Sequence, residues 1–174
     1  MEKTIADNLT IQRSLTRLTY EIIEKNKGVN DLFLVGIKTR GEFLAKRMAK
    51  QMLKLEGAEV PVFAVDITDY RDDRPANEQH NDLSNQVLTN IDDKHIVLVD
   101  DVFYTGRTMR AAMDALMDLG RPERISIAVL VDRGHREMPI RPDFIGKNIP
   151  TASEEKIKVN LAEVDDHDSI DLIK

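Results

Sequence analysis

The chain has no cysteine and no tryptophan among its 174 residues, and it has only eight glycines and six prolines. Without cysteine it can form neither a disulfide framework nor a thiolate metal site, which suits a reducing compartment, so we expect a cytoplasmic protein. It has no apolar run long enough to cross a membrane and no basic region followed by an apolar one at its N-terminus. We therefore expect no membrane partner.

The composition is that of an ordinary globular domain, with 41% hydrophobic and 32% charged residues. A chain of this length can bury a substantial core, so we expect a single domain spanning residues 1–174. The formal net charge of −6 argues against indiscriminate binding of nucleic acid, which depends on neutralising phosphates. It leaves room for a local basic face.

The most informative stretch runs from Ile96 to Met109. Its first four residues are apolar on both faces, as in a central strand of a parallel sheet that is covered by helices on both sides. The strand is predicted to end at Asp100 and Asp101. Residues 105–108 (Thr-Gly-Arg-Thr) are then predicted to turn the chain into a helix.

That helix has a regular apolar face, because Met109, Met113 and Leu116 follow a spacing of four and three residues. Gly120 is placed to end it, and Pro122 follows. A buried strand followed directly by an amphipathic helix is one unit of an α/β fold.

The turn between strand and helix has the chemistry of a phosphate site. A helix N-terminus offers unpaired N–H groups and a partial positive charge, Gly106 allows close approach of the backbone, and the hydroxyls of Thr105 and Thr108 add donors. Asp100 and Asp101 are unsuited to a phosphate but suited to sugar hydroxyls or to magnesium. Together these residues predict a site for a sugar phosphate.

Each of these features is common by itself, because many Thr-Gly turns precede helices and many acidic pairs are simply solvated. Their combination after a buried strand favours the phosphate site. The stretch has neither the Gly-Lys-Ser/Thr ending of a Walker A loop nor the Gly-x-Gly-x-x-Gly pattern of a dinucleotide site.

A second anion site is predicted after another apolar strand, Leu32–Ile37. The basic pair Lys38 and Arg40 lies beside Gly41 at the carboxyl end of that strand. The alternative is a plain turn with exposed basic side chains. A helix is predicted from about residue 42 to 55, closed by Gly57.

Three further segments complete the pattern. Residues 61–68 and 125–131 are predicted strands, and a first helix runs from about Leu9 to Lys27, where Gly28 ends it. Between residues 70 and 86 the chain is polar without periodicity, which predicts a functional loop, with Arg71 and Arg74 able to meet phosphates on closure. The acidic C-terminal run from Asp165 to Asp171 is predicted to be a solvated terminus.

Residues 97–109 resemble the 13-residue motif with which type I phosphoribosyltransferases bind 5-phosphoribosyl 1-pyrophosphate (PRPP). The segments 35–41, 66–73 and 129–151 narrow the resemblance to the bifunctional PyrR family, whose members are pyrimidine operon attenuators with uracil phosphoribosyltransferase activity. The resemblance covers residues from about Leu9 to about Asp166.

The resemblance implies a mostly parallel sheet flanked by helices, with a small hood mainly from about residues 132–160. It also implies formation of UMP and pyrophosphate from uracil and PRPP with Mg²⁺, UMP-responsive binding of pyrimidine operon leader RNA, and a homodimer or higher oligomer. UTP is a second candidate effector. The alternatives are a uracil enzyme without an RNA role and a phosphoribosyltransferase for another base.

Residue roles follow from the same resemblance. The catalytic residues would be Asp100, Asp101 and Arg40, and the two acids would meet magnesium indirectly, through PRPP. Binding of PRPP and UMP would involve Thr39, Arg40, Gly41, Val97, Leu98, Val99, Asp100, Asp101, Val102, Phe103, Tyr104, Thr105, Gly106, Arg107, Thr108 and Met109. Backbone groups near Val131, Arg133 and Ile140 would read the uracil edge.

The resemblance also implies an RNA-binding face. Its candidates are Arg13, Thr16, Arg17, Arg136, Arg141 and Lys147. For the first helix, the alternative is a plain solvated face. Tyr20 stands where a family relative has His, and Lys25 stands where it has Arg. Lysine keeps the positive charge at position 25 but lacks the planar set of N–H donors of a guanidinium.

Overall fold

The computed structural model describes residues 1–72 and 90–174 of the chain. Five strands form a parallel sheet in the order β3-β2-β4-β5-β6. They are β2 (Leu32–Ile37), β3 (Val62–Val65), β4 (His95–Phe103), β5 (Arg124–Asp132) and β6 (Phe144–Asn148). The predicted α/β class with a mostly parallel sheet is confirmed.

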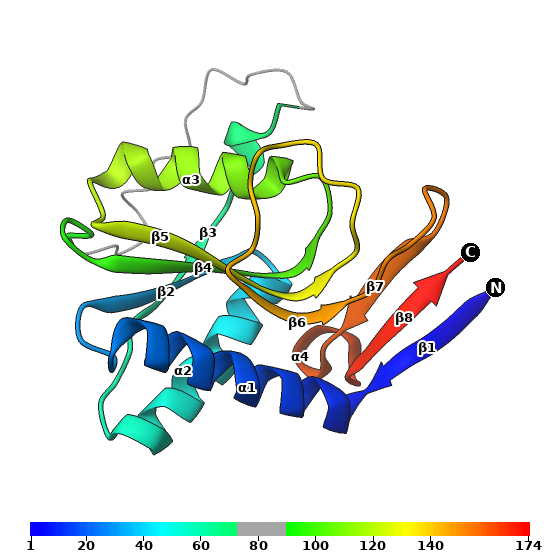
Figure 1. Cartoon of the computed structure of the whole chain (residues 1–174), viewed down its shortest axis with the longest axis horizontal. Coiled ribbons are helices and arrows are strands. Elements are labelled where there is room, and N and C mark those ends of the chain that lie inside the picture. Colours follow the sequence, from blue (N-terminus) through cyan, green and yellow to red (C-terminus); the bar gives the residue numbers. More distant parts are fainter. Residues whose placement is uncertain (73–89) are drawn as a thin grey trace.

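Helices cover both faces of this sheet (Figure 1). Helices α1 (Asn8–Asn26) and α2 (Arg40–Glu56) lie on one face, and α3 (Arg107–Leu119) lies on the other. Successive side chains of β4 point to opposite faces of the sheet, and both sets are apolar, so each face needs a covering helix. Val97 and Val99 pack in the cluster with α1 and α2, whereas Ile96 and Leu98 pack with α3.

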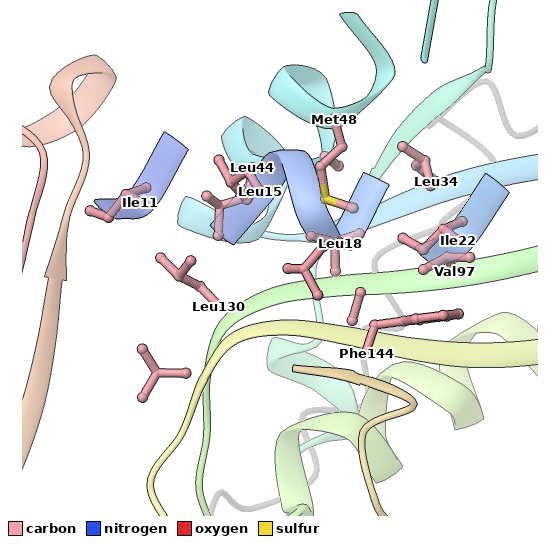
Figure 2. Packing of buried hydrophobic residues seen from close by; sticks show 14 of the residues in the cluster. Ile11, Leu15, Leu18, Ile22, Leu34, Leu44, Met48, Val97, Leu130 and Phe144 are labelled. Atoms are coloured by element: carbon pink, nitrogen blue, oxygen red, sulfur yellow. The ribbon is translucent and has the colours of Figure 1, made fainter. Parts of the chain in front are cut away.

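The apolar stripe of α1 forms the larger core cluster with α2 and the sheet. Figure 2 shows Leu15, Leu18 and Ile22 pointing from α1 toward strand residues such as Val97 and toward Phe144 of β6. All of these side chains are almost completely buried. Cutting one such leucine back to alanine would cost about 2–5 kcal/mol of stability.

A second sheet has three antiparallel strands in the order β1-β8-β7. They are β1 (Glu2–Asp7), β7 (Lys156–Asn160) and β8 (Ser169–Ile173), and the short helix α4 (Ala162–Asp165) lies between the last two. Of these three strands, only β7 falls within the segment 132–160 from which a hood was expected. Because β1 pairs with β8, the two ends of the chain lie side by side (Figure 1).

The structure corrects the predicted element ends. Strand β4 continues through Asp100 and Asp101 to Phe103 rather than stopping at the acids. The left-handed residue that closes α1 is Lys27, with φ +56°, and not Gly28. Gly57 does close α2 in that conformation, but Gly120 ends α3 with an extended backbone, φ 164°. The strand predicted at 61–68 is only four residues long and is followed by a 3₁₀ turn, η1 (Thr68–Tyr70).

The acidic C-terminal run is not a solvated terminus, so that prediction was wrong. Asp171 is buried and accepts hydrogen bonds from Thr4, Asn160 and Ser169, which ties β1, β7 and β8 together. The side chain of Asp168 is only 6% exposed and pairs with Arg47 of α2.

Candidate functional site

The candidate site lies at the carboxyl ends of β2 and β4. The chain passes from β2 to β3 on one side and then returns to β4 on the other side of β2, with α2 and α3 on opposite faces. The loops after β2 and β4 therefore diverge and leave a crevice, which is where open α/β sheets bind ligands. Two adjoining cavities of about 250 and 290 Å³ fill it, and they share Arg71, Asp100 and Thr108.

The first cavity surrounds the loop from Tyr104 to Thr108 and the start of α3. Gly106 before this helix has no side chain to cap it, and the N–H of Arg107 donates to Thr105 Oγ1 at 3.3 Å. The N–H groups of Thr108 and Met109 at the helix start remain suited to an anion. Gly106 has φ +94°, and a Cβ there would lie 3.2 Å from Met138 Cβ, which explains why glycine occupies the position. The carbonyl oxygen of Thr105 accepts hydrogen bonds from the N–H groups of Glu137 and Met138, which fixes the loop against the chain after β5.

The two acids lie where the cavities meet. Asp100 is 9% exposed, and Asp101 beside it is more accessible. Burial raises the pKa of Asp100 well above its ordinary value, and the neighbouring charge of Asp101 raises it further. Hydroxyl donors or a positive charge would bind favourably to this carboxylate, because either one would offset the free-energy cost of its desolvation.

The second cavity contains the predicted anion site after β2. It is lined by Lys38, Thr39 and Arg40, and the peptide bond between Lys38 and Thr39 is cis. A Cβ on Gly41 would collide with the carbonyl oxygen of Val99, so glycine lets the start of α2 pack directly on β4. The two predicted anion sites therefore face one crevice, with the acids between them.

Not every residue of the expected PRPP motif reaches the crevice. The side chains of Val97, Leu98 and Val99 are almost completely buried in the two core clusters, and none of them lines either cavity. They position the strand rather than contact a ligand. From Asp100 to Met109, by contrast, every residue except Asp101 lines the first cavity, and Asp101 lines the second.

The expected base-reading residues have a different arrangement. The N–H of Arg133 donates to Phe103 O and its carbonyl accepts from Thr151, which argues against this backbone as a reader of the base. Val131 lies inside the sheet, in register with Val102 and Lys147.

The third base-reading candidate, Ile140, and the side chain of Arg133 are also placed by the structure. The N–H of Ile140 donates to Met138 O. The guanidinium of Arg133 lies 4.0 Å from the ring centre of Tyr104, a residue that is 40% exposed. Arg133 therefore supports an accessible aromatic face beside the first cavity.

Some lining residues were not identified from the sequence. Asp66 and Thr68 line the second cavity, and Glu137 holds Arg107 through a 3.0 Å hydrogen bond. Asp66 directly follows β3 and so lies at the same carboxyl edge of the sheet. This position after a predicted strand could have identified Asp66 from the sequence. No local pattern connects Glu137 with Arg107, because they are thirty residues apart.

The predicted functional loop at residues 70–86 is described only in part. Arg71 lines both cavities, and Asp72 pairs with Arg107 at 2.6 Å. Arg74 and the rest of the loop up to residue 86 lie outside the described residues.

The RNA candidates of α1 lie beside those of the segment 141–147. Arg17 donates to the carbonyl oxygens of Ile145 and Gly146 on β6, next to Lys147, and it also pairs with Glu21. Arg13, Thr16, Arg136 and Arg141 are exposed, and Lys147 is half-buried. Within residues 1–72 and 90–174, no carboxylate forms an ion pair with Arg13, Arg136, Arg141 or Lys147, so their charge remains available to an anionic partner.

The donor set suits a magnesium ion that is held mainly by a ligand. Among residues 1–72 and 90–174, no three histidines or carboxylates are grouped closely enough to hold a metal by themselves. Asp100 and Asp101 supply two carboxylates, which fits an ion that keeps waters and binds phosphate oxygens. None of the described helices is long and apolar enough to span a membrane.

Comparison with known proteins assigns this arrangement to a family. The model of the phosphoribosyl transferase domain matches residues 1–166. The bifunctional protein PyrR of Latilactobacillus sakei is 60% identical, with 100% of this chain and 99% of that protein covered. The bifunctional protein PyrR of Limosilactobacillus fermentum is 61% identical, with 99% and 98% covered.

Solved structures show the same fold at low sequence identity. The hypoxanthine phosphoribosyltransferase of Trypanosoma cruzi has a TM-score of 0.71 at 17% identity, with 99% of this chain and 96% of that chain covered. A hypoxanthine phosphoribosyltransferase from Staphylococcus aureus also has a TM-score of 0.71, at 18% identity, with 99% and 92% covered. At such identities the likeness concerns the fold alone.

Proposed function

The chain belongs to the phosphoribosyltransferase family and, within it, to the bifunctional PyrR proteins, and from this membership we propose its function. It transfers the phosphoribosyl group of PRPP to uracil, and it regulates a pyrimidine operon by binding leader RNA in response to UMP. The observation that carries the enzymatic part is the crevice in which a helix N-terminus, an acidic pair and a basic loop face one another.

In the reaction, a bond forms between N1 of uracil and C1 of the ribose, and the bond from C1 to the pyrophosphate oxygen breaks. The N1 proton is lost and pyrophosphate leaves. The loop from Thr105 to Thr108 holds the 5′-phosphate through the N–H groups at the start of α3. Thr39, Arg40 and Gly41 hold the pyrophosphate at the opposite end of the crevice.

Asp100 and Asp101 hold the ribose hydroxyls between these two anchors. As the leaving group departs, positive charge grows on the sugar, and the carboxylates stabilise it. The burial of Asp100 strengthens this effect, because few waters screen its charge. No side chain is assigned as a general base, so positioning and electrostatics provide most of the rate.

Magnesium fits this site as a partner of PRPP, since it neutralises charge on the pyrophosphate when bound. Uracil would lie near Tyr104, whose accessible ring is supported by Arg133. Ile140 remains a candidate among the backbone groups that read the base edge. We further propose that the chain is one phosphoribosyltransferase domain that acts as a homo-oligomer.

The RNA-binding part is supported by the basic side chains along α1 and β6. Arg13 and Arg17 lie on α1, and Lys147 lies on the neighbouring β6. Arg136 and Arg141 lie in the chain between β5 and β6. RNA hairpins are recognised through backbone shape and exposed bases, so a clustered basic face suffices despite the net charge of −6. UMP in the crevice would favour the RNA-binding state, which is a coupling between two sites.

A base panel tests the enzymatic proposal directly. Uracil, orotate, hypoxanthine and guanine are each incubated with PRPP, Mg²⁺ and the protein, and nucleotide and pyrophosphate are measured. We expect UMP from uracil and little product from the other bases. A preference for guanine, or for hypoxanthine, the base named for both structural neighbours, would refute the substrate assignment.

A further inference from the structure

The guanidinium of Arg40 is held by a residue from the far end of the chain. Its Nε donates to Asp165 Oδ2 at 3.2 Å, and its Nη2 donates to Asp165 Oδ1 at 2.8 Å and to Oδ2 at 3.0 Å. The two side chains are 30% and 18% exposed, so the pair is partly shielded from water. A two-pronged contact of this kind fixes the plane of the guanidinium as well as its position.

The contact leaves one edge of Arg40 unused. Within residues 1–72 and 90–174, Nη1 of Arg40 makes no hydrogen bond, although the residue lines the second cavity beside Lys38 and Thr39. Asp165 therefore engages one side of the guanidinium and leaves the other side available to an anion.

Asp165 is itself anchored firmly. Its carboxylate accepts the N–H of Leu161 at 3.0 Å, and its own N–H donates to Leu161 O at 2.7 Å. Leu161 is completely buried in the larger core cluster. The hydrogen bond from Leu161, together with the charge of Arg40, lowers the pKa of Asp165 and keeps it ionised at neutral pH.

The segment that carries Asp165 is also tied to α2 at a second point. Arg47 donates to both carboxylate oxygens of Glu163 and to both of Asp168, at 2.6–2.8 Å. Arg40 and Arg47 are seven residues apart, so they lie on the same face of α2, two turns from each other. The α4 segment therefore rests on two arginines of one helix face, and only Arg40 reaches the crevice.

We propose that Asp165 is a positioning residue that orients Arg40 so that its free edge binds the pyrophosphate of PRPP. The proposal rests on the role of Arg40 proposed above. It adds to the reaction a residue from the acidic run at the C-terminal end, which makes no contact with the substrate. Its hydrogen bonds with the backbone of Leu161 keep this carboxylate in place.

The test compares two acids of the same four-residue helix. Asp165→Asn should raise KM for PRPP and the inhibition constant of pyrophosphate by roughly three- to tenfold, the effect of losing about one oriented hydrogen bond. The value of kcat should change much less. Glu163→Gln, which removes a partner of Arg47 instead, is the matched control and should leave both constants near the wild-type values.

A double variant separates positioning from general support of the fold. If Asp165 acts through Arg40, Asp165→Asn should have no further effect on KM in an Arg40→Ala background. The proposal is overturned if KM of Asp165→Asn equals or falls below that of the wild type, if Glu163→Gln has the same effect, or if the effect persists without Arg40.

Failure of the enzymatic assignment would be recognised separately, because the wild type would then form no UMP from uracil. In that event, calorimetric titration of PRPP with Mg²⁺ into the same variants gives the result for Asp165. Weaker binding by Asp165→Asn but not by Glu163→Gln would support its role, and equal binding by the wild type and Asp165→Asn would refute it.

Discussion

The carboxylate of Asp100 accepts a 2.9 Å hydrogen bond from the backbone N–H of Asp101, and the carboxylate of Asp101 accepts a 2.8 Å bond from the N–H of Val102. The two acids are thus held in turn by the backbone at the end of β4. Only Asp100 is buried, and its pKa is raised. The pair therefore places an unfavourable buried charge at the point where the sugar is expected to bind.

This arrangement predicts opposite effects of Asp100→Asn on activity and stability. Turnover should fall about 100-fold or more, because the charge that stabilises the transition state is lost. Since a raised pKa means that the folded protein binds the proton more tightly, ionisation of Asp100 costs stability as pH rises. The variant should therefore melt a few degrees higher than the wild type at pH 7.5.

The gain in melting temperature should shrink as pH falls to the ordinary Asp pKa of 3.8, below which Asp100 is protonated in both states of the wild type. Thermal unfolding at several pH values, together with uracil turnover, measures both effects. Near-normal turnover, or a lower melting temperature at pH 7.5, would contradict the role and the burial cost assigned to Asp100.

Gly106→Ala should weaken PRPP binding. Alanine at φ +94° is strained by about 1–2 kcal/mol, and its Cβ would press on Met138 and Phe103, so the phosphate loop must shift. Gly57→Ala is a suitable control, because φ is also positive there, at +69°, and nothing lies within 4 Å of the added Cβ.

Both glycine variants should lose stability in urea unfolding, whereas only Gly106→Ala should raise KM for PRPP. An unchanged KM in Gly106→Ala would mean that the loop does not hold the 5′-phosphate. A similar increase in both variants would mean that the effect arises from stability alone.

His95 predicts a pH dependence of stability that is separate from the active site. Burial, together with the nearby charge of Arg124, lowers its pKa to about 4. Its ring contacts Asn26 Oδ1 at 2.8 Å and Ser126 Oγ at 2.9 Å, and the guanidinium of Arg124 lies 3.1 Å from Nδ1, where its charge favours the neutral ring. Because the unfolded chain takes up the proton at a higher pH, the stability is complete above about pH 6.5 and decreases as pH falls toward 4.

The decrease that arises from His95 should be at most about 3 kcal/mol. Urea unfolding at pH 4.5, 5.5 and 7 is compared for the wild type and His95→Gln. The variant should be less stable at pH 7 and should lose less stability on acidification. Parallel pH profiles for the two proteins would show that His95 is not the group responsible.

The sequence predicted the part of the molecule in which local pattern and buried partners agree. The apolar runs at 32–37 and 125–131 became central strands, and the Thr-Gly turn became the start of α3. Strand β1, by contrast, was not predicted from the sequence. It is a polar edge strand, and such a strand is specified by its pairing, here with β8 at the other end of the chain.

The same limit applies to the site. Its acids and phosphate loop are adjacent in sequence, so a local pattern identified them, although the structure shows that three of the apolar residues in that pattern only support the strand. The contact between Asp165 and Arg40 spans 125 residues. An acidic run looks solvated in sequence, and only folding reveals that Asp165 and Asp168 meet particular arginines and that Asp171 meets polar side chains.

The basic face along α1 and β6 predicts the effect of single charge removals on RNA affinity. Arg141→Ala should weaken binding several-fold and reduce the salt dependence by about one counterion. Arg121→Ala is the control, since this exposed residue follows α3 on the opposite face of the sheet. Gel shifts at several salt concentrations measure both variants. Equal weakening would indicate a purely non-specific attraction.

The most direct test of the account is a gel shift of the wild-type protein with its own pyrimidine operon leader RNA, with and without UMP, at a fixed salt concentration. Uracil turnover is measured on the same preparation. The account predicts turnover together with RNA binding that UMP tightens. Turnover without any shift would contradict the regulatory half and leave a uracil phosphoribosyltransferase, with Tyr20 and Lys25 of α1 as the first positions to revert.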